Sequence, residues 1–194
     1  SKVFAEKGFV PIIEPVRQNL KPLEKCLETL IENHCSVIVI QNPSVGHFKN
    51  DKDSIYNYLS HRYPNHDKIC YGYYVRDDRE AEWVTLAVKK RNVKSALIHA
   101  GLTSGKRFAE AVTGLENLNL SVFLERYCGK LYQQHFAFHD NRVLVKNGFE
   151  KRNNRDYQPV EFFSDLHLTY LMEGQTGFGD FLTVGDSYSD SGGP

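Results

Sequence analysis

Acidic side chains follow several β-rich runs of this sequence, where they could act on a bound molecule. Glu14 and Glu125 each end such a run, and Asp165 lies in a later β-like piece. Carboxylates that meet at one edge of a sheet can serve as general acid and base, or hold a divalent metal. The alternative is structural, with each carboxylate bonded to backbone amides or paired with an arginine such as Arg126.

A histidine occupies a similar position. His99 ends a β-rich run and precedes Ala100 and Gly101, which suits a general base. A histidine at a strand end can equally be held by hydrogen bonds alone. We predict three catalytic residues for a hydrolytic reaction: Glu14, His99 and Glu125. We predict four ligand-binding residues, which are Asn42, Arg76, Arg126 and Asp165.

Metal and nucleotide motifs are weak in this chain. His135 and His139 lie four apart, but in a predicted β region that spacing does not make a ligand pair, and we predict no metal site. The segment 101–106 resembles a phosphate loop, yet it is one residue short and Arg107 replaces the metal-binding hydroxyl. An ordinary helix cap is the favoured interpretation, and the sequence leaves the cofactor unknown.

A repeated order of strand, loop and helix must position these residues. The β-rich runs are each about as long as a buried strand: Phe9–Glu14, Ser36–Gln41, Lys68–Val75, Ser95–Ala100 and Leu120–Glu125. All but the last are followed by segments whose apolar residues recur at the spacing of an α-helix. This order predicts a parallel α/β sheet, in which ligands bind at the carboxyl ends of the strands. We therefore expect one pocket lined by Glu14, Asn42, Arg76, His99, Glu125 and Arg126.

The predicted fold is a (β/α)-barrel-like, TIM-type parallel sheet with helices outside, in one domain over residues 1–194. Residues 1–129 hold the βα units, and residues 130–194 hold a β-hairpin with its turn at Asn147-Gly148 and an irregular β-rich tail. A closed barrel usually needs about 250 residues, so we expect an incomplete barrel, a fragment of a longer one. Its open edge would favour a homodimer.

Burial expectations follow from the same pattern. The side chains expected inside are Ile12, Val37, Val39, Leu97 and Phe123. Cys26 falls on the apolar stripe of a predicted helix that begins at Lys21-Pro22. The four cysteines, which form no C-x-x-C pair, are interpreted as buried reduced thiols of a cytoplasmic protein.

The composition of the chain limits the kinds of partner that we expect. The chain of 194 residues is 41% hydrophobic and 25% charged, with a formal net charge of zero, so no general attraction to nucleic acid or membranes is expected. No apolar run approaches the roughly 20 residues that span a bilayer, and no signal peptide is visible. A basic run could still contact a nucleic-acid backbone, or be a solvated hairpin tip: Lys146, Lys151, Arg152 and Arg155.

Several segments together resemble an uncharacterised bacterial family known by a myxobacterial locus tag, allied to the phage-associated beta-protein family. They are the segments 9–16, 41–46, 162–170, 177–181 and 188–194, of which the last ones are the most specific. The resemblance covers nearly the whole chain. It implies an aromatic-rich strand before Ser1, more barrel after Pro194 and a mobile-element or defence setting, but no established activity.

Three functions follow as hypotheses. The first is a hydrolase that acts on a small molecule at the strand ends. The second is a protein- or nucleic-acid-binding module of a phage-related or defence system, and the third is a scaffold without chemistry. Convergence of the strand-end acids would favour the first, and a flat basic or aromatic face near Lys146 the second.

Overall fold

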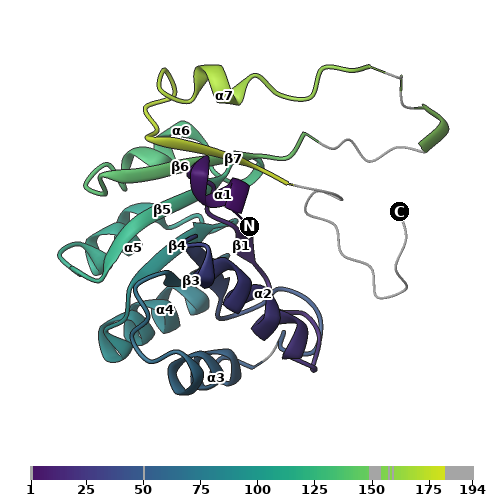
Figure 1. The fold of residues 1–194 in the computed structure, drawn as a ribbon. Coiled ribbons are helices and arrows are strands. Elements are labelled where there is room, and N and C mark those ends of the chain that lie inside the picture. The colour runs from purple at the N-terminus through teal and green to yellow at the C-terminus, as the bar shows by residue number, and fades with distance from the viewer. Residues whose placement is uncertain (1, 50, 149–153, 157, 159, 182–194) are drawn as a thin grey trace.

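The computed structural model describes residues 2–49, 51–148, 154–156, 158 and 160–181. Seven strands form one sheet, in which every neighbouring pair is parallel and the spatial order equals the sequence order. The sheet curls into a half-barrel with helices on its outer face (Figure 1). The strands are β1 (Ile12–Ile13), β2 (Val37–Ile40), β3 (Ile69–Val75), β4 (Ser95–His99), β5 (Leu118–Leu124), β6 (Asn141–Lys146) and β7 (Gly177–Asp180).

Helices connect these strands, as parallel pairing requires. The longer ones are α2 (Lys21–Glu32), α3 (Ser54–Arg62), α4 (Asp78–Arg91) and α5 (Gly105–Val112). The shorter ones are α1 (Lys2–Glu6), η1 (Glu125–Tyr127), α6 (Lys130–Gln134), η2 (Asn154–Asp156) and α7 (Leu166–Thr169). The α/β class, the parallel order of the first five runs and the outer helices are therefore confirmed.

Both faces of the sheet are buried, which explains the near-continuous apolar strands. In β2, Val37 and Val39 belong to the core shared with the helices, while Ile38 and Ile40 belong to a second cluster on the other face. Each of these side chains is at most 2% exposed. Burying an aliphatic side chain of this size contributes about 1.5–3 kcal/mol, so β2 anchors both layers.

Helix α4 shows how local sequence sets the ends of an element. The Asp77 carboxylate accepts a hydrogen bond from the Glu80 backbone N–H at 2.9 Å, as an N-cap does. At the other end Asn92 adopts a left-handed conformation with φ of 47°. Asp77 therefore fixes the start of α4 directly after β3, and Asn92 marks its end.

The predicted hairpin is not confirmed. Strand β6 contains its expected first arm, but β6 pairs in parallel with β5 on one side and with β7 on the other. A strand with two parallel neighbours has no edge left for an antiparallel partner. Phe149, which should begin the second arm, lies outside the described residues.

Three finer expectations are wrong. Ile12 is 40% exposed because β1 is an edge strand that pairs only with β2. The Cys26 side chain is exposed, since Leu27 and Leu30 form the buried face of α2. The piece expected to be β-like around Asp165 contains α7 instead, where the Asp165 carbonyl accepts bonds from the backbone N–H groups of the next turn.

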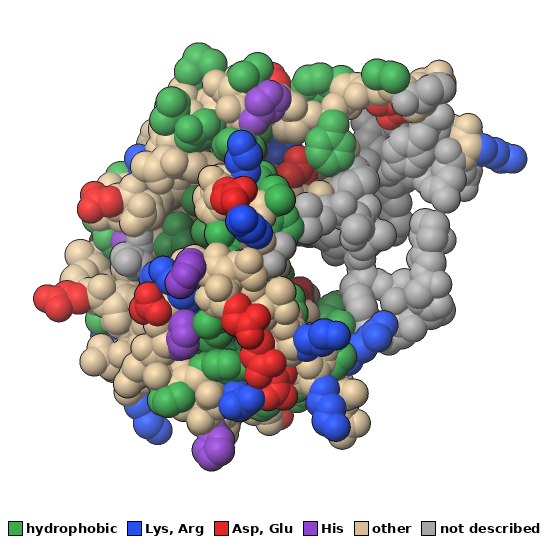
Figure 2. Space-filling view, in the orientation of Figure 1, with side chains coloured by type: hydrophobic (Ala, Val, Ile, Leu, Met, Phe, Trp, Pro, Cys, Tyr) green, Lys and Arg blue, Asp and Glu red, His purple; other side chains and the backbone are tan. Residues whose placement is uncertain are grey.

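The surface mixes both signs of charge, and exposed hydrophobic side chains gather around α7 (Figure 2). They include Leu168, Leu171 and Met172, which are 67–79% exposed. Across the described part of the chain, none of the helices combines the length and apolar character that crossing a bilayer requires.

Candidate functional site

Glu14 lies directly after β1, where its carboxylate collects donors from two other parts of the chain. Its Oε1 atom accepts hydrogen bonds from the Ser44 backbone N–H at 2.5 Å and from Ser44 Oγ at 2.7 Å. Its Oε2 atom accepts a bond from Tyr74 Oη at 3.1 Å. Hydrogen bonds to an ionised acceptor are the stronger kind, so the half-buried carboxylate is held in one orientation.

The loop after β2 is placed by a close backbone approach. The His47 N–H donates to the Val16 carbonyl at 2.8 Å. Gly46 has φ of 76°, and a Cβ there would lie only 2.2 Å from the Val16 oxygen. Only glycine fits both constraints. The loop therefore lies against the segment after β1 and brings Ser44 to Glu14.

Asn42 fixes Tyr74 by extending the pairing of β2 with β3. Its Nδ2 donates to the Tyr74 carbonyl at 3.0 Å, and its Oδ1 accepts from the Tyr74 N–H at 2.9 Å. The Asn42 side chain is buried, with 3% of the residue exposed. Asn42 thus acts on the site through Tyr74, whose phenol reaches Glu14.

Arg76 and Glu80 form an ion pair beside Tyr74. Glu80 Oε2 accepts from the Arg76 backbone N–H at 3.0 Å and from its Nε at 2.9 Å, while Nη2 donates to Oε1. Burial opposes the charge of Arg76, but its hydrogen bonds and the charge of Glu80 outweigh burial and raise the Arg76 pKa; the charge of Glu14 contributes further. The guanidinium also lies 5.5 Å from the centre of the Tyr74 ring.

These residues form one group at the carboxyl ends of β1, β2 and β3, which we call the rim cluster: Glu14, Asn42, Ser44, Tyr74, Arg76 and Glu80. It contains two carboxylates and one guanidinium. Such a set offers a proton acceptor, fixed hydroxyl donors and a permanent positive charge within one polar network. These groups can support proton transfer to or from a bound molecule.

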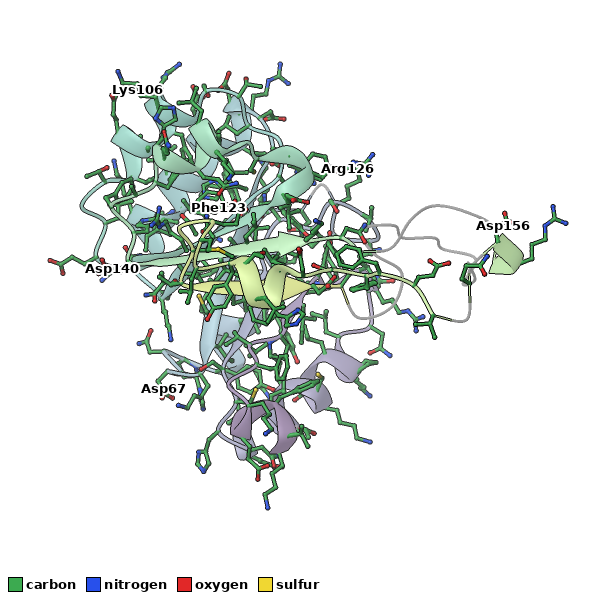
Figure 3. All side chains as sticks on the ribbon, turned by 90° about the horizontal axis from the view of Figure 1, so that it is seen from above. Asp67, Lys106, Phe123, Arg126, Asp140 and Asp156 are labelled. Carbon is green, nitrogen blue, oxygen red and sulfur yellow. The ribbon has the colours of Figure 1, made fainter. Side chains whose placement is uncertain are left out.

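Four predicted residues lie outside the rim cluster: His99 in the core, and Glu125, Arg126 and Asp165 at the surface. Glu125 is exposed in η1 and its Oε1 lies 3.8 Å from Lys146 Nζ. Arg126, which Figure 3 shows at the opposite end of the strands from Asp140, is exposed and lies over the Tyr127 ring. Asp165 is exposed before α7.

His99 lies in the core, contrary to its predicted place at the rim. Residues alternate across β4, and His99 shares the helix-facing side with Leu97. Its Nδ1 atom is 2.8 Å from Tyr132 Oη and its Nε2 atom is 3.1 Å from Ser121 Oγ. With 0% of its surface exposed, His99 cannot meet a ligand from solution in this conformation.

Sequence reasoning missed three members of the rim cluster: Ser44, Tyr74 and Glu80. Glu80 had a usable signal, because it stands four residues after Arg76 and three after the capping Asp77. Tyr74 and Ser44 had none, since their roles depend on strand register and on the loop fixed by Gly46.

Two further kinds of site can be compared with the described residues: a group of metal ligands and a basic surface for nucleic acid. No three histidine, cysteine or acidic side chains come together there as a metal-binding group. In the basic run, Lys146 approaches Glu125, and Arg155 lies 3.8 Å from Asp156, so carboxylates offset both charges. Lys151 and Arg152 lie outside the described residues.

Comparisons with known proteins identify no relative of this chain. No protein-family model matches the chain, and neither the curated proteins nor the solved structures contain a match to it.

Proposed function

We propose that the rim cluster is the active site of a hydrolase that acts on a small polar molecule. One observation carries the proposal. Glu14, at the carboxyl end of a parallel strand, is oriented by three hydrogen bonds and yet remains partly accessible. Catalytic groups in parallel α/β sheets gather at this edge, and a fixed orientation is what an acid or base needs.

The proposed roles follow from the chemistry of each group. Glu14 accepts a proton from the attacking water, while Tyr74 and Ser44 hold its carboxylate. Arg76 contributes a positive charge to developing negative charge on the substrate, because a guanidinium retains donors beyond those that Glu80 uses. Asn42 is a positioning residue that acts through Tyr74.

The half-barrel supports a finer structural proposal. Sequential parallel strands with helices on one face are the arrangement of TIM-type barrels. We propose that the sheet is part of such a barrel. The family resemblance and its phage-related setting remain predictions.

The test compares two substitutions of the same chemistry. The wild-type protein, Glu14→Gln and Glu125→Gln are assayed against p-nitrophenyl esters, glycosides and phosphates. We expect the wild type to hydrolyse one class, Glu14→Gln to lose at least about a hundredfold in kcat/KM, and Glu125→Gln to retain activity. Equal losses in both variants, an active Glu14→Gln, or no hydrolysis of any class would contradict the proposal.

A further inference from the structure

A chain of buried hydrogen bonds crosses the half-barrel away from the rim cluster. It runs from Tyr132 of α6 to His99, then to Ser121 of β5, and ends at His139 before β6. The last link joins Ser121 Oγ to His139 Nδ1 at 2.7 Å. Each of its two histidines and Ser121 is at most 6% exposed. We call these four side chains the histidine chain.

Within the described part of the chain, no negatively charged side chain acts on the His99 ring. The His99 ring packs against the rings of Phe108, Phe136 and Tyr132. It also stacks on the ring of Phe123 in the neighbouring strand, with 4.6 Å between the ring centroids. The Cys128 thiol donates to the His99 carbonyl rather than to the ring. The Tyr132 hydroxyl is bonded to the ring, and the charge of His139 lowers the pKa of His99.

His139 has a different environment at the other end of the chain. It lies against the Phe138 ring at 4.4 Å and is followed by the exposed Asp140. Burial lowers the pKa of His139, and the charge of Asp140 opposes that shift. His99 has no such neighbour, so burial lowers its pKa well below the ordinary value of 6.5 and His139 lowers it further.

Neutral rings satisfy the hydrogen bonds of the histidine chain. The Ser121 hydroxyl has one proton, so it donates to one histidine and accepts from the other. With both rings neutral, the His99 ring donates once and accepts once, while His139 contributes its Nδ1 to the bond with Ser121. A second proton on His99 would take away the acceptor of the Tyr132 hydroxyl and leave an unpaired charge among aromatic rings.

We propose that the histidine chain makes the docking of α6 on the sheet sensitive to pH, so that acid opens the fold locally at α6 and at the start of β6. Helix α6 supplies Tyr132, and the turn after it supplies Phe136, which lies 4.3 Å from His99. Moving this segment outward is the direct way to admit water to a protonated ring.

The sign of the effect is fixed by the lowered pKa. The histidine is neutral in the closed state and has its ordinary pKa of about 6.5 in the open state. Above pH 6.5 it is neutral in both states, so pH does not weaken the closed state there. Below that value the opening equilibrium rises about tenfold for each pH unit, until the pKa of the buried ring is reached.

The test is hydrogen exchange of the whole protein between pH 7.5 and pH 5.0, followed by mass spectrometry and corrected for intrinsic exchange rates. In a peptide covering 129–140 we expect the opening equilibrium to rise by at least about tenfold per pH unit below 6.5, since His99 alone takes up one proton. A peptide from α4 (Asp78–Arg91) should stay unchanged. His99→Gln, which cannot take the charge, should reduce the response to the part that His139 contributes, whereas His61→Gln, at an exposed histidine, should preserve it in full.

Nitrogen NMR of the imidazole rings keeps the proposal testable if His99→Gln fails to fold. The His99 ring of the wild type should keep one neutral tautomer at pH values where the exposed histidines are already protonated. The proposal is overturned if exchange in 129–140 does not change with pH, if α4 opens in parallel, or if every ring titrates near 6.5 while 129–140 stays protected.

Discussion

Replacing Glu14 with glutamine tests whether the rim cluster is a rigid network. The substitution keeps the size of the side chain and removes its charge. One amide oxygen can still accept from Ser44, but the amide nitrogen then faces Tyr74 Oη, which lies 3.1 Å from Oε2 in the wild type. The change therefore converts the hydrogen bonds at Oε1 from charged to neutral, and at Oε2 it replaces the bond from Tyr74 Oη with a neutral one in which the amide N–H donates to that oxygen.

The magnitude follows from the number of bonds and their exposure. A hydrogen bond to a charged group contributes about 1.5–3 kcal/mol, and a neutral one about 1 kcal/mol. With three bonds affected in a half-buried site, we expect the free energy of unfolding to fall by about 2 kcal/mol. For a chain of this size, that corresponds to a Tm decrease of roughly 4–8 °C.

Urea denaturation followed by circular dichroism measures this loss, with Glu125→Gln as the matched control. Glu125 is exposed and 3.8 Å from its lysine partner, so its loss should stay within about 0.5 kcal/mol. Combining Glu14→Gln with Tyr74→Phe should cost less than the sum of the two single changes, by at least about 0.5 kcal/mol. Additive costs, or equal losses at Glu14 and Glu125, would refute the rigid network.

Three further outcomes follow from packing and burial. Phe136→Ala should lower the unfolding free energy by about 3–5 kcal/mol in a urea titration, because the ring is fully buried; a loss below about 1 kcal/mol would contradict the described core. Asn92→Gly should leave the Tm nearly unchanged, whereas Asn92→Val should lower stability by about 1–2 kcal/mol, since φ is positive there; similar melting of both would refute this reasoning. At pH 8 a thiol reagent should modify Cys26 first, because burial raises the pKa of Cys70 to about 12; rapid modification of all thiols in the folded protein would show that the core is open.

Much of the fold could be predicted because its signals are local. Runs such as Val37–Ile40 show their burial directly, and Asp77 and Asn92 mark both ends of α4. The hairpin prediction, which is not confirmed, rested on Asn147-Gly148, a local turn signal. The parallel pairing of β6 with β7 depends on residues far along the chain, and tertiary pairing outweighs the turn preference.

The candidate site could be predicted only where position along a strand was sufficient. Glu14, Asn42 and Arg76 follow adjacent strands, and the structure brings them together. His99 also ends a strand, yet the alternation of side chains turns it toward the helices. A shift of one residue along a strand moves a side chain from one face of the sheet to the other. Sequence patterns do not locate the end of a strand to within one residue, so they do not separate a rim position from a core position.

The order of the strands has a consequence for synthesis of the chain on the ribosome. Each strand pairs only with the strands next to it in sequence, as in Ile12 with Ile38, Ile38 with Cys70, and Gly72 with Ala96. A strand that leaves the ribosome therefore finds its partner already made and never waits for a distant part of the chain. The half-barrel can grow one βα unit at a time from its amino end, with a single unpaired growing edge to protect from aggregation at each stage.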